Sequence, residues 1–212
     1  MRIEFWLDYL CPVSYLTHKN LLAALKELNI NNYELYYRSY QLKENCTDEL
    51  LVKTMADYYD EKTFKKTIAI LDKEYPKYKE LKMFDTSLAH QLAHLAKRFN
   101  LQVVYNMEVL KAYFEEGLEI SDANILKQIG IKIGLEPQAI DYTLMSKCYK
   151  NQIAINKENA SIKGINYIPH LRVNIKENFN QYLSKGEIKK IIVEAINHKG
   201  IKREICGEYC EY

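Results

Sequence analysis

The stretch of the chain that decides the fold lies at residues 2–16 and reads RIEFWLDYLCPVSYL. Its first seven residues are rich in aromatic and aliphatic side chains, which is typical of a β-strand. Apolar residues then recur at helical spacing through Leu28. Pro12 suits the first position of this helix, because an N–H group there would have no partner inside the helix. The stretch therefore predicts a strand leading into a helix of about four to five turns, with Cys11 as its N-cap.

The remaining sequence extends this pattern around a long helical block. Tyr33–Leu42 alternates and is rich in tyrosine, so it predicts a second strand. Residues 47–156 carry apolar stripes at helical spacing, with Cys148 expected in the core. Alternation returns directly after Pro169, and a second short strand is predicted over Phe179–Leu183. A capping-box sequence then opens a last helix. The chain is therefore expected to be one α/β domain interrupted by helices.

Composition and charge exclude several functional classes. The 212 residues are 48% hydrophobic and 27% charged, which is the ordinary globular range. The net charge of +2 is too small for the basic footprint of a nucleic-acid-binding protein. No apolar run approaches the ~18 residues of a membrane span, and acidic residues interrupt the start of the chain where a signal peptide needs an apolar stretch. We therefore expect a soluble cytoplasmic protein that binds neither nucleic acid nor membrane.

The cysteine pattern fits a reducing compartment. The chain has an odd and widely spread set of five: Cys11, Cys46, Cys148, Cys206 and Cys210. A secreted protein held together by disulfides would have an even number of cysteines at closer spacing. Cys206 and Cys210 could form a redox pair or be spectator thiols in a tail, and one pair alone is a poor zinc site. His90 and His94 have no third ligand in view and are expected to be structural, so no metal is predicted.

Cys11 is the main candidate for chemistry. A cysteine at a helix N-terminus has its thiolate stabilised by backbone N–H groups, and its pKa can fall to about 3.5–7.5. Ser14 lies one turn further along on the same face, where it can only hydrogen-bond to the thiolate or to a ligand. The alternative is an inert buried cysteine beside an ordinary first-turn proline. Pro169 opens a strand and could be cis, but only about 5–6% of X–Pro bonds are, so spacing alone favours an ordinary trans proline.

Four segments together resemble a known family, the DsbA-like thioredoxin superfamily. The resemblance is to its FrnE-type branch, which shares its architecture with kappa-class glutathione transferases and 2-hydroxychromene-2-carboxylate isomerases. The matching segments are Phe5–Pro12 with Tyr15 and Leu16, Asp85–His90, Ala112–Gly117, and Ser161–Ile165 leading into Ile168 and Pro169. FrnE-type proteins also tend to carry paired C-terminal cysteines, similar to Cys206 and Cys210.

The resemblance implies a thioredoxin-like fold with a large all-helical insertion. Residues 1–46 and 157–200 would form the thioredoxin-like domain, residues 47–156 the insertion, and residues 201–212 a cysteine-containing tail.

The resemblance also implies roles for particular residues. Cys11 takes the position of the catalytic nucleophile, with Ser14 beside it. Pro169 is implied to be cis, and Pro12, Ile168 and Pro169 are implied to bind a substrate, with the Ile168 backbone available to an extended peptide or to glutathione.

Ser14 separates this chain from dithiol oxidoreductases, which carry Cys-x-x-Cys. A single thiol can form a mixed disulfide, but another thiol must resolve it. We therefore expect a monothiol thiol–disulfide oxidoreductase that uses glutathione or the Cys206/Cys210 pair for this step. Its partners would be glutathione or a thiol- or disulfide-containing protein, with glutathione as a cosubstrate and no bound cofactor. The oligomeric state is left open, with a homodimer as one alternative.

Two other functions stay open. Kappa transferases and chromene isomerases have serine where this chain has Cys11, followed by Pro-x-Ser, so Ser14 matches their second serine. They activate the thiolate of bound glutathione, but this chain has Leu183-Ser184-Lys185 where they favour an acidic glutathione contact. The third hypothesis is a non-catalytic thioredoxin-like module that binds an extended peptide beside Pro169.

Overall fold

The structure is a computed structural model that describes residues 1–42, 49–174 and 177–207, with residues 177 and 198–207 described by their backbone alone. Its elements are β1 (Arg2–Leu7), α1 (Pro12–Glu27), β2 (Glu34–Ser39), α2 (Leu51–Tyr58), α3 (Glu61–Glu74), a short 3-10 helix η1 (Pro76–Glu80), α4 (Ser87–Arg98), α5 (Gln102–Phe114), α6 (Ala123–Lys132), α7 (Pro137–Ser146), α8 (Lys150–Ile162), β3 (His170–Val173), β4 (Glu177–Phe179) and α9 (Lys185–Gly207). The predicted order of β-α-β, helical block and β-β-α is confirmed. No described helix is both long and apolar enough to cross a membrane.

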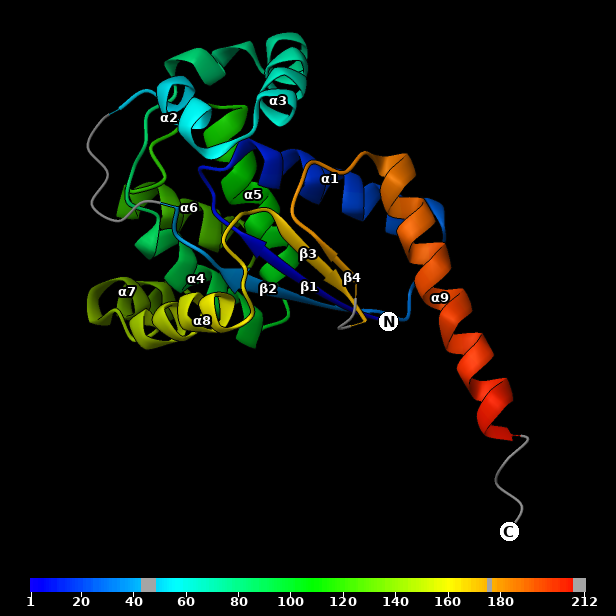
Figure 1. Cartoon of the computed structure of the whole chain (residues 1–212). Helices are drawn as coiled ribbons and strands as arrows, with labels where there is room; N and C mark the ends of the chain where they lie inside the picture. The colour runs from blue at the N-terminus through cyan, green and yellow to red at the C-terminus, as the bar shows by residue number, and fades with distance from the viewer. Residues whose placement is uncertain (43–48, 175–176, 208–212) are drawn as a thin grey trace.

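The strands form one sheet in the order β2-β1-β3-β4 (Figure 1). β1 pairs parallel with β2 and antiparallel with β3. It lies inside the sheet because its side chains are apolar on both faces: Phe5 packs into the main core, and Trp6 packs into a second cluster on the opposite face. Both side chains are fully buried.

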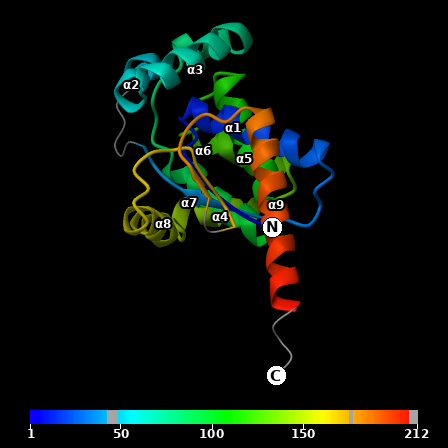
Figure 2. The same ribbon diagram turned by 45° about the vertical axis from the view of Figure 1, so that its right-hand side comes forward.

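Helices cover the sheet from both sides. α1 packs against α9, and α8 contacts β2. Figures 1 and 2 both show α1 and α9 on one side of the strands and α8 on the other. The start of α1 therefore lies between the sheet and the helical block, so this block can contribute side chains to any site built around Cys11.

Buried tyrosines join the β-α-β opening to the helical block. The hydroxyl of Tyr9 donates to Asn106 Oδ1 at 2.6 Å, and the Tyr15 ring stacks on Phe114 with ring centroids 5.1 Å apart. Tyr15 also donates its hydroxyl hydrogen to Glu115. Because a buried phenol needs a hydrogen-bond partner, these pairs fix how the two parts pack as well as burying apolar area.

Two expectations from the sequence are wrong in detail. Cys148 is exposed rather than in the core, because α7 ends at Ser146 and Lys147 adopts a left-handed conformation that breaks the helical period. The last strand covers Glu177–Phe179 instead of Phe179–Leu183, because Phe179 pairs with Leu171 in an antiparallel ladder. Leu183 is instead buried in the core ahead of α9.

The predicted capping box before the last helix is present, but the helical block ends later than predicted. Ser184 and Glu187 form the predicted capping box: the Ser184 N–H donates to Glu187 Oε2 at 2.7 Å, and the Glu187 N–H donates to Ser184 Oγ at 3.3 Å. α8 continues past residue 156, the expected end of the insertion, as far as Ile162.

Candidate active site

Cys11 is the N-cap of α1, as predicted. Its side chain accepts a hydrogen bond from the backbone N–H of Ser14, with 3.2 Å between nitrogen and sulfur. Pro12 occupies the first turn of the helix, where its missing N–H costs nothing. The strand-to-helix junction therefore holds the sulfur at the positive end of α1.

Two further groups contact the sulfur from distant parts of the chain. The hydroxyl of Tyr59 lies 2.9 Å from Cys11 Sγ, and the carbonyl oxygen of Ile168 lies 3.7 Å from it. A protonated thiol fits these neighbours, because it can donate to the Ile168 carbonyl while it accepts from Ser14 N–H and the Tyr59 hydroxyl.

Of the predicted site residues, the structure brings Ser14, Ile168 and Pro169 close to Cys11. The Ile168–Pro169 peptide bond is cis, as the resemblance implied. Ile168 shares a buried cluster with Cys11, Trp6 and Val13. Ser14 is fully buried, and its hydroxyl oxygen has no hydrogen-bond partner in the part of the chain that the structure describes.

Burial overturns the expected activation of Cys11. Its side chain is fully buried, and loss of hydration raises the pKa of the Cys11 thiol to about 11. Hydrogen bonding from Ser14 and Tyr59 lowers this pKa, and the nearby charge of Asp8 raises it, but both effects are smaller than desolvation. The helix terminus is in the predicted place, yet in this conformation the thiol is protonated at neutral pH.

Tyr59 is the site residue that the sequence analysis missed. It follows α2 directly and packs against the cluster that contains Cys11. It also lines a groove of about 260 Å³ together with Tyr40, Tyr58, Tyr167 and Ile168. The groove is thus lined by both Tyr59 and Ile168, the two residues from distant parts of the chain that contact the sulfur. With 18 tyrosines in the chain, nothing in the sequence distinguished this one.

Comparison with known proteins identifies the family to which this arrangement belongs. The family model for the DSBA-like thioredoxin domain matches residues 2–184. The chain belongs to the DsbA-like thioredoxin family. The predicted α/β, thioredoxin-like fold with a helical insertion is thereby confirmed.

Solved structures share the fold of this DsbA-like chain. A probable DsbA oxidoreductase from Streptomyces coelicolor has a TM-score of 0.78 at 16% identity, covering 93% of this chain and 90% of that one. The cytosolic disulfide reductase DsbM from Pseudomonas aeruginosa, solved with glutathione, has a TM-score of 0.68 at 15% identity, covering 96% and 100%. A 2-hydroxychromene-2-carboxylate isomerase has a TM-score of 0.65 at 14% identity, covering 97% and 98%. The family thus contains disulfide oxidoreductases and has an isomerase among its structural neighbours.

A buried carboxylate organises the junction behind the thiol of the DsbA-like site. Asp8 is fully buried and accepts hydrogen bonds from the backbone N–H groups of Tyr9 and Leu42, each at 2.7 Å. His90 Nε2 lies 3.3 Å from the same side chain. His90 thus has the structural position expected of it, and Asp8 ties the end of β1 to residue 42 and to α4.

Of the other four cysteines, the structure describes the side chain of Cys148. Cys148 is free and exposed. Cys46 and Cys210 lie outside the described residues, as does the side chain of Cys206, so a Cys206/Cys210 redox pair stays a prediction. Among the described residues, no three His, Cys, Asp or Glu side chains gather into a potential metal site.

The raised pKa predicts an unusual pH profile for Cys11. A thiol with a pKa of about 11 gains roughly tenfold in thiolate for each pH unit up to that value. The rate of Cys11 alkylation by iodoacetamide should therefore still climb between pH 9 and pH 10. In guanidinium chloride, where the fold is lost, the same profile should level off near the ordinary cysteine pKa of about 8.5. A folded-state profile that levels off below pH 8 would contradict the buried, protonated thiol.

Proposed function

We propose that this DsbA-like protein catalyses thiol–disulfide exchange through the single thiol of Cys11. The observation that carries the proposal is the position of the sulfur, which caps α1 and faces the Ile168 carbonyl beside the cis proline. The likeness to two solved structures, a probable DsbA oxidoreductase and a cytosolic disulfide reductase, supports the same chemistry.

The reaction needs a second thiol from outside the Cys11 motif. The Cys11 thiolate attacks one sulfur of a substrate disulfide, a new S–S bond forms to Cys11, and the other sulfur leaves as a thiolate. Ser14 cannot resolve this mixed disulfide. A glutathione thiolate therefore attacks it, which regenerates Cys11 and leaves the glutathione moieties as a disulfide. With a glutathionylated substrate, Cys11 takes the glutathione sulfur, so overall the substrate disulfide and one reduced glutathione give the free substrate thiol and one glutathione disulfide.

The buried thiol makes exchange depend on opening. At neutral pH only a very small fraction of a thiol with a pKa of about 11 is ionised. Attack along the groove displaces Tyr59 and readmits water, which moves the pKa back toward its ordinary value. The start of α1 then favours the thiolate. The closed conformation is thus a resting state, and a substrate segment that fills the tyrosine-lined groove favours the reactive one.

The test is catalysis with a glutathionylated peptide and reduced glutathione. We expect reduction above the uncatalysed rate, and a glutathione adduct that peptide mapping locates on Cys11 and that excess glutathione removes. Adducts confined to the exposed Cys148, with no catalysis, would overturn the proposal.

A glutathione-dependent isomerase or transferase is the second candidate. The neutral state of Cys11, the position of Ser14 and the likeness to a 2-hydroxychromene-2-carboxylate isomerase favour it. In that case glutathione should bind saturably without forming an adduct, and the reaction should survive in Cys11→Ser, which has the serine that those enzymes carry.

A further inference from the structure

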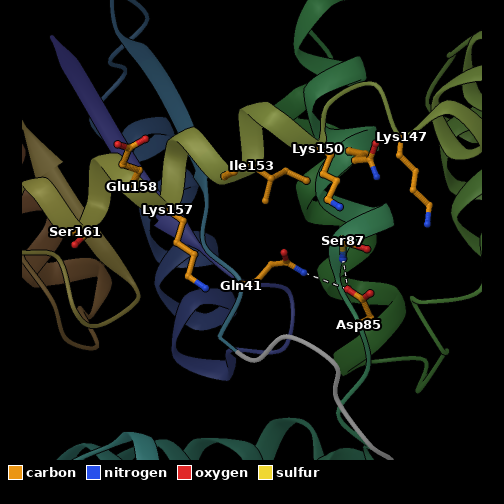
Figure 3. Close-up of a pocket in the computed structure, with 11 residues that line it drawn as sticks. Gln41, Asp85, Ser87, Lys147, Lys150, Ile153, Lys157, Glu158 and Ser161 are labelled. Carbon is orange, nitrogen blue, oxygen red and sulfur yellow. Dashed lines mark hydrogen bonds between the residues drawn. The ribbon is translucent and has the colours of Figure 1, made fainter.

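A second cavity lies between α4 and α8, with a volume of about 630 Å³ (Figure 3). It is larger than the tyrosine-lined groove, and neither Cys11 nor Tyr59 lines it. It is lined by Gln41, by residues at the start of α4, by Lys147 directly after α7, and by residues along α8.

One wall of this cavity combines positive charge with apolar surface. Lys150 and Lys157 are seven residues apart on α8, or about two turns, so they share a face of the helix. Figure 3 shows both side chains extending toward the side occupied by Gln41 and Ser87, while the carboxylate of Glu158 points the other way. Ile153 and Ala154 lie between the two lysines in sequence and supply apolar lining.

The opposite wall is polar and largely hydrogen-bonded within itself. Asp85 Oδ1 accepts from the backbone N–H of Ser87 at 2.8 Å and from Gln41 Nε2 at 3.1 Å. Its charge is therefore already engaged at the start of α4. Lys147 adds a third cation to the lining. Among the residues that the structure describes, the lining thus has more positive than negative charge, and Glu158, one of its two carboxylates, is turned away.

Gln91 is the feature that points to a ligand. Its side chain is 2% exposed and lines the cavity, and its buried carboxamide oxygen has no hydrogen-bond partner among the described residues. A buried polar group without a partner is costly, and such groups are rare in folded proteins. A ligand with an O–H or N–H donor next to its charged end would satisfy this oxygen.

We propose that this cavity binds a small organic anion. Lys150 and Lys157 hold its carboxylate or phosphate groups by charge-assisted hydrogen bonds. Ile153 and Ala154 contact its apolar body, and the carboxamide oxygen of Gln91 accepts a hydrogen bond from an O–H or N–H group on it. The site is independent of the thiol chemistry proposed for Cys11, and binding alone tests it.

The experiment is calorimetric titration of the full-length protein at low salt with three probes: adipate, its uncharged diamide and inorganic phosphate. We expect saturable binding of adipate and none of the diamide. Binding of phosphate with equal affinity would assign the site to inorganic anions and overturn the organic ligand. The Cys11→Ser variant should bind adipate like the wild type.

Variants decide whether the cavity is the site. Lys150→Gln with Lys157→Gln should weaken adipate binding about tenfold or more, as expected for lost charge-assisted hydrogen bonds. The matched control, Lys62→Gln with Lys73→Gln, removes the same charge from exposed positions on α3 and should leave binding unchanged. Gln91→Leu should weaken the binding of 2-hydroxyadipate, whose hydroxyl can donate to the Gln91 carboxamide oxygen, and should leave the binding of adipate, which has no donor, unchanged. The substitution should not lower the melting temperature of the free protein. Equal losses in both lysine pairs would mean non-specific attraction and would refute the site.

Discussion

Replacing Cys11 with serine should reduce the exchange of glutathionylated peptide to the uncatalysed rate. A hydroxyl cannot form the mixed disulfide, so no part of the reaction can pass through residue 11. Serine is also a good helix N-cap and is close to cysteine in size, so the variant should keep α1 and unfold cooperatively. Steady-state rates measured with circular dichroism on the same samples separate lost chemistry from lost folding.

The matched control for this variant is Cys148→Ser. Cys148 is free and exposed beyond the end of α7, so its removal should leave the exchange rate unchanged. If Cys11→Ser keeps the wild-type rate while a cysteine elsewhere proves essential, the redox centre does not lie at α1. If both variants keep the rate, the protein does not use these thiols at all.

Two substitutions of Tyr59 should change the reactivity of Cys11 in opposite directions. Tyr59→Ala removes the ring from above the sulfur and readmits water, and desolvation is the largest cause of the raised Cys11 pKa. Each unit by which the pKa falls gives about tenfold more thiolate at neutral pH, so alkylation should accelerate about tenfold or more. Tyr59→Phe keeps the ring but loses the hydroxyl 2.9 Å from Sγ, whose hydrogen bond lowers the pKa. Alkylation should then become several-fold slower.

Tyr167→Ala is the control for the groove. Tyr167 lines the same groove and is 59% exposed, so its removal alters the groove without uncovering the sulfur. The rate of Cys11 alkylation in Tyr167→Ala should stay close to that in the wild type. The measurement is the rate of iodoacetamide labelling at Cys11 by peptide mapping at pH 7.5. A change of the same sign in Tyr59→Ala and Tyr59→Phe would show that Tyr59 does not cover the thiol in the way described.

Local patterns in the sequence predicted the parts of the site that are fixed locally. The strand and helix on either side of Cys11 follow from a strand-like run, a first-turn proline and helical spacing. The capping box of Ser184 and Glu187 depends on two residues one turn apart, and it formed as expected. Residue spacing alone could not predict the cis bond before Pro169. Its prediction rested on the resemblance of several segments to the family, and the structure has this bond in the cis form.

The rest could not be predicted because it depends on contacts between distant segments. Burial is the largest cause of the raised Cys11 pKa, and two residues that contact the buried sulfur, Tyr59 and Ile168, come from the helical block and from the segment before β3. A helix N-terminus predicts a low pKa only when water or charge accompanies it, and here burial dominates. The cavity likewise needs Gln41 and Lys157 to face each other, and no periodicity in one segment reports that.

The pairing of β1 has a consequence for how the chain folds as it leaves the ribosome. One edge of β1 pairs with β2, which is synthesised soon after β1. The other edge can pair only after β3 has been synthesised. Phe5 pairs with Leu171, a partner synthesised about 165 residues later. Until then the nascent chain has an unpaired strand edge and exposed apolar side chains that are buried in the folded protein. Such edges can pair with other chains and lead to aggregation. The helical block can form early from local contacts, but closing the sheet is a late, long-range and therefore slow event.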